Sequence, residues 1–78
     1  MQHNMRKIDD LNIIGIRKLA YSYIKVNTEI RLGQAIFNAA FEFFPHAVNK
    51  LRGTEYDCFY DDDRIDKFLE KLREFDAE

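Results

Sequence analysis

The 78-residue chain carries a formal net charge of −2 at pH 7, is 46% hydrophobic, and holds seven Phe and four Tyr but no Trp. This length indicates one domain with a small core, and this hydrophobic content excludes wholesale disorder. The mild charge balance argues against a dedicated nucleic-acid binder, which is usually plainly basic. We therefore expect a single domain over residues 1–78, with residues 1–7 as a flexible tail.

The lone cysteine, Cys58, excludes an internal disulfide and does not by itself make a zinc site. The N-terminus lacks the apolar run and small-residue cleavage site of a signal peptide, and the apolar runs are far too short to span a membrane. We therefore expect a cytoplasmic protein without a membrane segment. Met5 is an alternative start to Met1, and the sequence leaves that choice open.

Residues 8–26 place apolar side chains at helical spacing from Ile13 to Tyr23, with basic residues on the other side. Asp9 or Asp10 can cap this helix by accepting a hydrogen bond from a free backbone N–H. The competing interpretation is a strand in the segment YSYIKV, which is rich in aromatic and β-branched residues. We favour the helix and keep the strand as the alternative.

Residues 28–44 predict the central helix, because apolar side chains occupy most of its circumference and such a helix is buried on most sides. Asn27 or Thr28 is expected to cap it, with Glu29 in the first turn suiting the helix dipole. Pro45 ends it, since proline lacks an N–H group and disfavours the helical conformation of the residue before it.

Pro45 also suits the first position of a short second helix, which Gly53 closes in the left-handed conformation. A loop over residues 54–62 follows, and we expect its aromatic residues to fold back onto the core: Tyr56, Phe59 and Tyr60. Asp62 or Asp63 then caps a last helix, whose apolar stripe is Ile65, Phe68, Leu69, Leu72 and Phe75. Together these elements predict an all-α fold, a small bundle of three to four helices around the central helix.

Residues 31–69 contain, in order, the segments RLGQ, LRGTEYDCFYDD and RIDKFL, with Asn38 and Pro45 between the first two. This pattern resembles a family of short uncharacterised proteins from bacterial genomes and their phages. The matching positions are Arg31, Gly33, Gln34, Asn38, Pro45, Arg52, Gly53, Thr54, Asp57, Phe59, Tyr60, Asp62, Ile65, Phe68 and Leu69. Cys58 departs from the family pattern, which has proline there. The resemblance implies an origin but no activity.

Four polar residues fall on one narrow stripe of the central helix: Arg31, Gln34, Asn38 and Glu42. Gln and Asn are neither good core residues nor the usual Lys/Glu choice for a surface. One interpretation is a solvated face with an internal bond to the loop that follows Arg52. The other is a ladder of hydrogen-bonding groups that grips a partner or an RNA or DNA backbone.

The charge is uneven along the chain, with six Lys/Arg against three Asp/Glu in residues 1–39 and six against eleven in residues 40–78. Six acidic residues crowd into residues 54–66: Glu55, Asp57, Asp61, Asp62, Asp63 and Asp66. Helix capping and solubility are one explanation, and a protein-binding acidic patch is another. A Ca²⁺ or Mg²⁺ site is the third, since these cations prefer clustered carboxylate oxygens. Their spacing does not fit an EF-hand calcium loop.

Two histidines, His3 and His46, have no carboxylate or nucleophile nearby in sequence to orient them as acid–base groups. Cys58 is flanked by acidic residues, which disfavour a thiolate, so we expect an inert semi-buried thiol. The sequence contains no nucleophile–base pair, metal-ligand set or phosphate-binding loop. We therefore expect a protein without catalytic activity, metal or cofactor.

These observations predict a small non-enzymatic interaction protein of phage or mobile-element origin. We expect it to bind another protein through the polar stripe and the acidic residues Glu55, Asp57, Asp61 and Asp62. The apolar surface exceeds what three short neighbouring helices cover, which predicts a homodimer or a patch reserved for a partner. The alternative function is a nucleic-acid-binding regulator that uses a basic N-terminal face of Arg17, Lys18 and Lys25, with Tyr21 available for base stacking.

Overall fold

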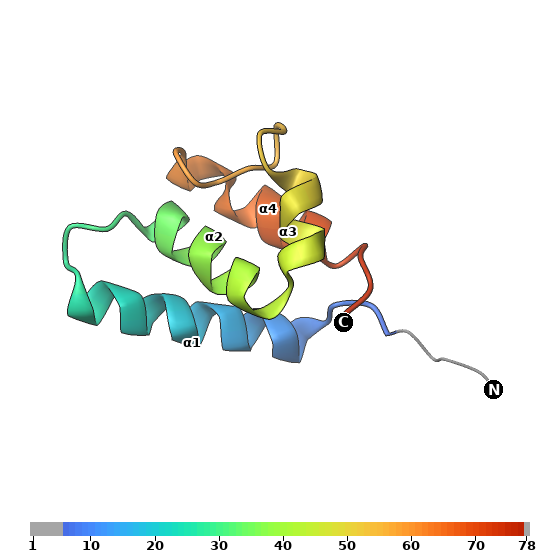
Figure 1. Ribbon diagram of the computed structural model, residues 1–78, viewed down its shortest axis with the longest axis horizontal. Coiled ribbons are helices and arrows are strands. Elements are labelled where there is room, and N and C mark those ends of the chain that lie inside the picture. The colour runs from blue at the N-terminus through green and yellow to red at the C-terminus, as the bar shows by residue number, and fades with distance from the viewer. Residues whose placement is uncertain (1–5, 78) are drawn as a thin grey trace.

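The computed structural model describes residues 6–77, which form four α-helices and one short 3₁₀ helix (Figure 1). In chain order these are α1 (Asp10–Val26), α2 (Leu32–Phe43), α3 (Pro45–Leu51), η1 (Asp62–Arg64) and α4 (Ile65–Leu72). The central helix α2 lies between α1 on one side and α3 with the η1–α4 segment on the other (Figure 1). The predicted all-α bundle is confirmed. Within residues 6–77, no helix has the length and apolar content needed to cross a membrane.

The first helix begins where its capping signal predicts. The Asp9 carboxylate accepts from the Asn12 N–H at 3.1 Å, and the Asn12 side chain accepts from the Asp9 N–H at 2.9 Å, forming a reciprocal capping box. Ile16 and Ala20 are fully buried against α2. The strand alternative for YSYIKV is wrong, because these residues continue the apolar helical stripe to the end of α1.

The central helix begins four residues later than the sequence predicts, at Leu32 rather than Thr28. The Asn27 carboxamide accepts from the Glu29 N–H at 3.1 Å, which makes a local turn instead of a helix cap. Neither Asn27 nor Thr28 caps α2, and Glu29 lies outside its first turn. A carboxylate from the distant Asp62 takes over the capping role, accepting from the Gly33 N–H at 2.9 Å.

The core of the bundle is built around α2, whose buried side chains are three alanines and two large apolar residues: Ala35, Ile36, Phe37, Ala39 and Ala40. The alanines let neighbouring helices approach closely, and Phe37 stacks on Phe68 of α4 with ring centroids 5.6 Å apart. Two aromatic residues of the same helix remain substantially exposed, Phe41 at 38% and Phe43 at 45%. The expected burial of α2 on most sides therefore fails at its C-terminal end.

The second half of the chain begins with α3, in which Pro45 occupies the first turn, as predicted. Gly53 follows the helix with φ +78, also as predicted. Asp61, rather than Asp62 or Asp63, caps the segment that leads into α4, because its carboxylate accepts from the Asp63 N–H at 3.0 Å. The apolar stripe of α4 is buried as expected, except that Phe75 follows the helix in a turn and is half-buried.

The three aromatic residues of the loop differ in burial: two pack against the core and one is exposed. Tyr56 and Phe59 are half-buried, and Phe59 stands edge-on to Phe37 with ring centroids 5.4 Å apart. The expectation that Tyr60 also packs on the core is wrong, because it is 84% exposed. Its ring lies against Phe59 at 4.8 Å, and Phe59 already occupies the place on the core.

The two ends of the described chain pair with each other. Lys7 and Asp76 form an antiparallel β-bridge and an ion pair at 3.2 Å. Ile8 is buried, and its N–H donates to the Phe75 carbonyl oxygen at 3.0 Å. Of the tail expected over residues 1–7, the first five lie outside the described residues, whereas the last two are paired with residues 76–77.

Candidate protein-binding surface

The start of α2 and the acidic loop, which lie about thirty residues apart in sequence, are joined by side-chain hydrogen bonds. Arg31 donates to the Phe59 carbonyl oxygen at 2.7 Å and to the Asp62 carboxylate at 3.4 Å. The same Asp62 oxygen accepts from the Gly33 N–H. An acid at the positive end of a helix dipole and beside a guanidinium is doubly favoured. Asp62 and Arg31 therefore hold the loop onto α2.

A close backbone approach at Gly33 completes this junction. Cys58 is fully buried, and its thiol donates to the Gly33 carbonyl oxygen at 3.3 Å. Burial, followed by the nearby Asp57 carboxylate, raises the pKa of the Cys58 thiol to about 12. The buried, protonated thiol agrees with the inert group expected from the sequence.

The loop between α3 and the junction is shaped by its own polar side chains. The Asp57 carboxylate accepts from the Gly53 N–H at 2.6 Å and from the Phe59 N–H at 2.9 Å. The Thr54 hydroxyl donates to the Leu51 carbonyl oxygen and accepts from the Tyr56 N–H. Asp57 therefore fixes the turn that presents Phe59 to the core.

The acidic run consequently contains two kinds of residue. Asp57, Asp61 and Asp62 accept hydrogen bonds from backbone N–H groups, so each stabilises local structure. Glu55 and Asp63 are exposed, and within residues 6–77 their carboxylates form no hydrogen bond or ion pair. These two carry the part of the predicted acidic patch that is free to meet a partner.

The polar stripe of α2 divides in the same way. Arg31 is engaged with the loop, whereas Gln34, Asn38 and Glu42 make no side-chain hydrogen bond within residues 6–77. Gln34 and Asn38 are half-buried beside apolar neighbours, and Glu42 is exposed. Each amide offers donors and an acceptor that the described fold does not use.

An apolar groove of about 520 Å³ runs beside this stripe, between the C-terminal half of α1 and α2. Tyr23, Ile30 and Phe41 supply its apolar lining, and Asn38 and Glu42 line it from the polar stripe. Val26, which is 88% exposed, forms part of the edge. Sequence reasoning missed this groove, because it assigned Phe41 to the core and treated the stripe in isolation.

Arg52 is a further member of this surface that sequence reasoning missed. Its guanidinium lies over the ring of Phe41 at 5.5 Å and over the ring of Phe37 at 5.0 Å. An Arg stacked on aromatic rings keeps its donors free for hydrogen bonds at the edge of the plane. One of these donors bonds Asn49 at 3.2 Å. The arrangement holds the half-exposed Phe41 beside the amide stripe.

The basic residues proposed for nucleic-acid binding are all on α1 but do not form one group. Lys18 and Lys25 lie on its exposed face together with Tyr21, which is 55% exposed. Arg17 lies at the edge of that face, 3.9 Å from the Asp66 carboxylate. The structure therefore brings together two of the three predicted cations and their aromatic neighbour.

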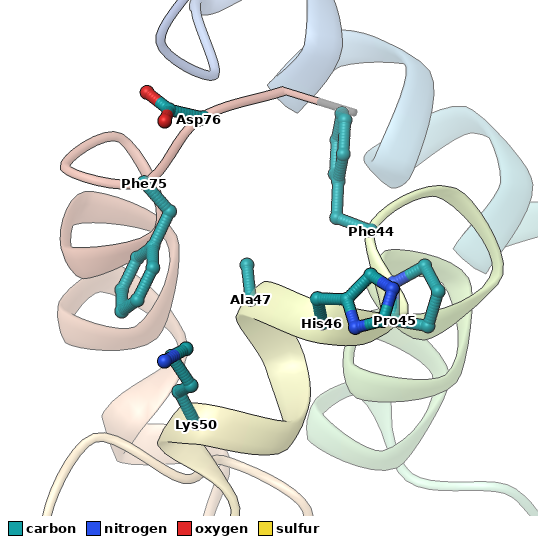
Figure 2. A pocket seen from close by; sticks show the side chains of 7 residues that line it. All are labelled: Phe44, Pro45, His46, Ala47, Lys50, Phe75 and Asp76. Atoms are coloured by element: carbon teal, nitrogen blue, oxygen red, sulfur yellow. The ribbon is translucent and has the colours of Figure 1, made fainter.

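A second cavity, of about 430 Å³, lies between the start of α3 and the C-terminal segment. Figure 2 shows Phe44 and Phe75 on opposite sides of this cavity, with Lys50 and Asp76 at separate points of its edge. The Asp76 carboxylate is paired with Lys7. His46 is exposed and, within residues 6–77, makes no side-chain hydrogen bond that would orient its imidazole. In the same residues, no group of three or more His, Cys, Asp or Glu is placed to hold a metal ion.

A scan against protein-family models, a search of curated proteins and a search of solved structures each found no match to this chain. The family resemblance of residues 31–69 stays a prediction. The structure does give its pattern a physical meaning, because Arg31 and Gly33 from the first segment bond directly to Cys58, Phe59 and Asp62 from the second.

Proposed function

We propose that this chain is a small non-enzymatic interaction protein that binds another protein along the polar stripe of α2 and the groove beside it. The observation that carries this proposal is the pair of solvent-accessible carboxamides on the half-buried residues Gln34 and Asn38. Neither amide has a hydrogen-bond partner within residues 6–77, and Asn38 lines the groove. Polar groups at a protein surface that lie beside an apolar groove are typical of ligand and partner sites. The predicted origin in a phage or mobile element remains a prediction.

The chemistry of this surface favours a polypeptide over a small molecule. The groove is open and shallow rather than enclosed, and its apolar side chains come from two helices and the turn between them. Carboxamides donate and accept at once, so they pair well with the alternating N–H and C=O groups of a peptide backbone. Phe41, held by Arg52, offers an aromatic anchor of the kind that dominates binding energy at interfaces.

The acidic loop adds negative charge to the proposed binding surface. Glu55 and Asp63 are exposed and, within the described residues, bonded to no other side chain, so they can attract a basic partner without any loss of internal structure. Asp57, Asp61 and Asp62 add to the same negative field while bonding the backbone. Such a field raises the association rate of a basic partner and makes it dependent on salt.

The test is site-specific photo-crosslinking in the native host, with benzoylphenylalanine placed at Val26 in the groove or at Glu70 on the exposed side of α4. We expect one discrete heterologous protein adduct from position 26 and none from position 70. The adduct is expected to disappear when Asn38→Arg blocks the groove. Labelling only of the protein itself, or equal labelling from both positions, would contradict the proposal.

The contribution of the acidic loop is tested with two substitutions that leave every described hydrogen bond intact, Glu55→Gln and Asp63→Asn. We expect the crosslinked adduct to form more slowly in the double variant and to show less dependence on salt. Circular dichroism should show an unchanged thermal transition. An adduct that forms at the wild-type rate would remove the acidic loop from the binding surface while leaving the groove in place.

A further inference from the structure

The side of α1 that faces away from α2 carries a straight row of exposed apolar and basic side chains. Figure 1 shows α1 along one edge of the molecule, with the other helices on a single side of it. The exposed row is Leu11, Ile14, Lys18, Tyr21 and Lys25. Leu11 is 77% exposed and Ile14 48%, although both are large apolar residues. Exposed apolar residues that line up on one face mark an interaction surface.

The spacing of the residues within this row favours a helical partner. Successive members are three, four, three and four residues apart, which keeps them in one line along the helix. A helix that packs against another by knobs-into-holes uses this spacing, and three of the five positions here carry large apolar or aromatic side chains, Leu11, Ile14 and Tyr21. At a rise of about 1.5 Å per residue, α1 offers a helical partner a seam of roughly 20 Å.

Gly15 supplies a second, independent observation. A Cβ atom added at Gly15 would meet no heavy atom within 4 Å, so no contact in the described residues requires glycine there. Glycine in a helix interior weakens the helix relative to alanine. Together with Leu11, Ile14 and Lys18, Gly15 outlines one hole of the seam, at positions i, i+3, i+4 and i+7. The missing side chain makes that hole deep enough for a large apolar knob.

The positive charges on this face favour a partner with acidic side chains. Lys18 and Lys25 flank Tyr21, and the single acidic residue of α1, Asp10, is paired with Arg73 beyond the end of α4. Within the described residues, neither lysine forms an ion pair. The C-terminal half of the seam therefore presents two positive charges that match carboxylates on an opposing helix.

We propose that the outer face of α1 docks an acidic amphipathic helix of a partner protein. A large apolar side chain of that helix enters the hole at Gly15, and its carboxylates face Lys18 and Lys25. This surface lies on the opposite side of α1 from the core, away from Ile16 and Ala20. It goes beyond the groove proposed above, because neither surface requires the other.

The probes are two fluorescein-labelled synthetic helical peptides that share leucines at a and d positions. One carries glutamate and the other lysine at the flanking e and g positions. We expect the wild-type protein to bind the glutamate peptide at least tenfold more tightly than the lysine peptide in fluorescence anisotropy. Gly15→Leu should weaken binding of the glutamate peptide about tenfold by filling the hole. The double variant Lys18→Glu, Lys25→Glu should reverse the preference.

The matched control is Lys50→Glu with Lys67→Glu, which makes the same change in net charge at two exposed lysines outside α1. The control should retain the preference for the glutamate peptide. Circular dichroism on every variant separates loss of binding from loss of folding, and the charge-swap variant tests the proposal even if Gly15→Leu misfolds. Equal binding of both peptides, or of neither, would overturn the proposal. So would tighter binding of a single-stranded oligonucleotide, or a wild-type dimer that Gly15→Leu dissociates in sedimentation.

Discussion

The junction between α2 and the acidic loop gives the sharpest prediction on stability, which is that Gly33→Ala destabilises the fold. A Cβ atom at Gly33 would overlap the carbonyl oxygen of Cys58 and lie 2.7 Å from a carboxylate oxygen of Asp62. The Cys58 oxygen belongs to the backbone, so the loop itself must move. That movement separates the Asp62 carboxylate from the Gly33 N–H, which it accepts from at 2.9 Å.

The size of the effect follows from two destabilising contributions to the free energy of unfolding and one stabilising contribution. Overpacking of this kind costs about 1–3 kcal/mol. Loss of the helix-capping bond from Asp62 adds about 1 kcal/mol. Alanine is a better helix former than glycine, which offsets about 0.5–1 kcal/mol. We expect a net loss of about 1–3.5 kcal/mol, a large share of the roughly 3–5 kcal/mol that a core of this size supplies.

Urea denaturation followed by circular dichroism measures this loss, and Gly15→Ala is the matched control. The same substitution at Gly15 meets no atom within 4 Å, so only the gain in helix propensity remains. We expect Gly15→Ala to raise the free energy of unfolding by about 0.5–1 kcal/mol. Equal stability of the wild type and the Gly33→Ala variant would refute the account of the junction given above.

Three further predictions concern the loop. Because burial raises the pKa of the Cys58 thiol to about 12 in the folded state, the unfolded chain releases this proton first and stability falls as pH rises above 9. The loss reaches about 1.4 kcal/mol at pH 10, and a Cys58→Ala variant should lack it in urea titrations. Phe59→Ala should destabilise the fold by about 2–4 kcal/mol, whereas Tyr60→Ala should change it by less than about 0.5 kcal/mol. Asp57→Ala removes two hydrogen bonds to the loop backbone and should lower the thermal midpoint by about 5–10 °C in calorimetry.

Local signals in the sequence predicted the helices well wherever the deciding contacts are also local. The Asp9 cap, Pro45 at the start of α3 and Gly53 in the left-handed conformation all act within a few residues of their own position. The apolar stripe of α4 succeeded for the same reason, since its period alone identifies the buried face.

The failures occur where a distant residue decides the outcome. The start of α2 was placed too early because Asn27 and Thr28 match a capping signal, while the actual cap comes from Asp62. Tyr60 was expected on the core because aromatic residues usually pack there, but Phe59 already occupies the site. Neither outcome follows from local periodicity, because both depend on how the loop folds back across α2.

Intramolecular hydrogen bonds also determine which residues can be substituted to test binding without changing the fold. Asp57, Asp61 and Asp62 were predicted to bind a partner, yet each accepts a hydrogen bond from a backbone N–H group. Replacing any of them changes the loop as well as its charge, so a loss of binding in such a variant would have two explanations.

Gln34 and Asn38 differ from these acids, because nothing within residues 6–77 uses their amides. A residue whose polar group has no intramolecular partner contributes little to folding, so its substitution isolates an effect on binding. The same holds for Lys18 and Lys25 on α1. The amides of the stripe and the two lysines on the outer face of α1 are therefore the positions at which a partner can be sought by mutation without first disturbing the fold. The apolar lining of the groove differs, because Tyr23 and Ile30 also pack against the core.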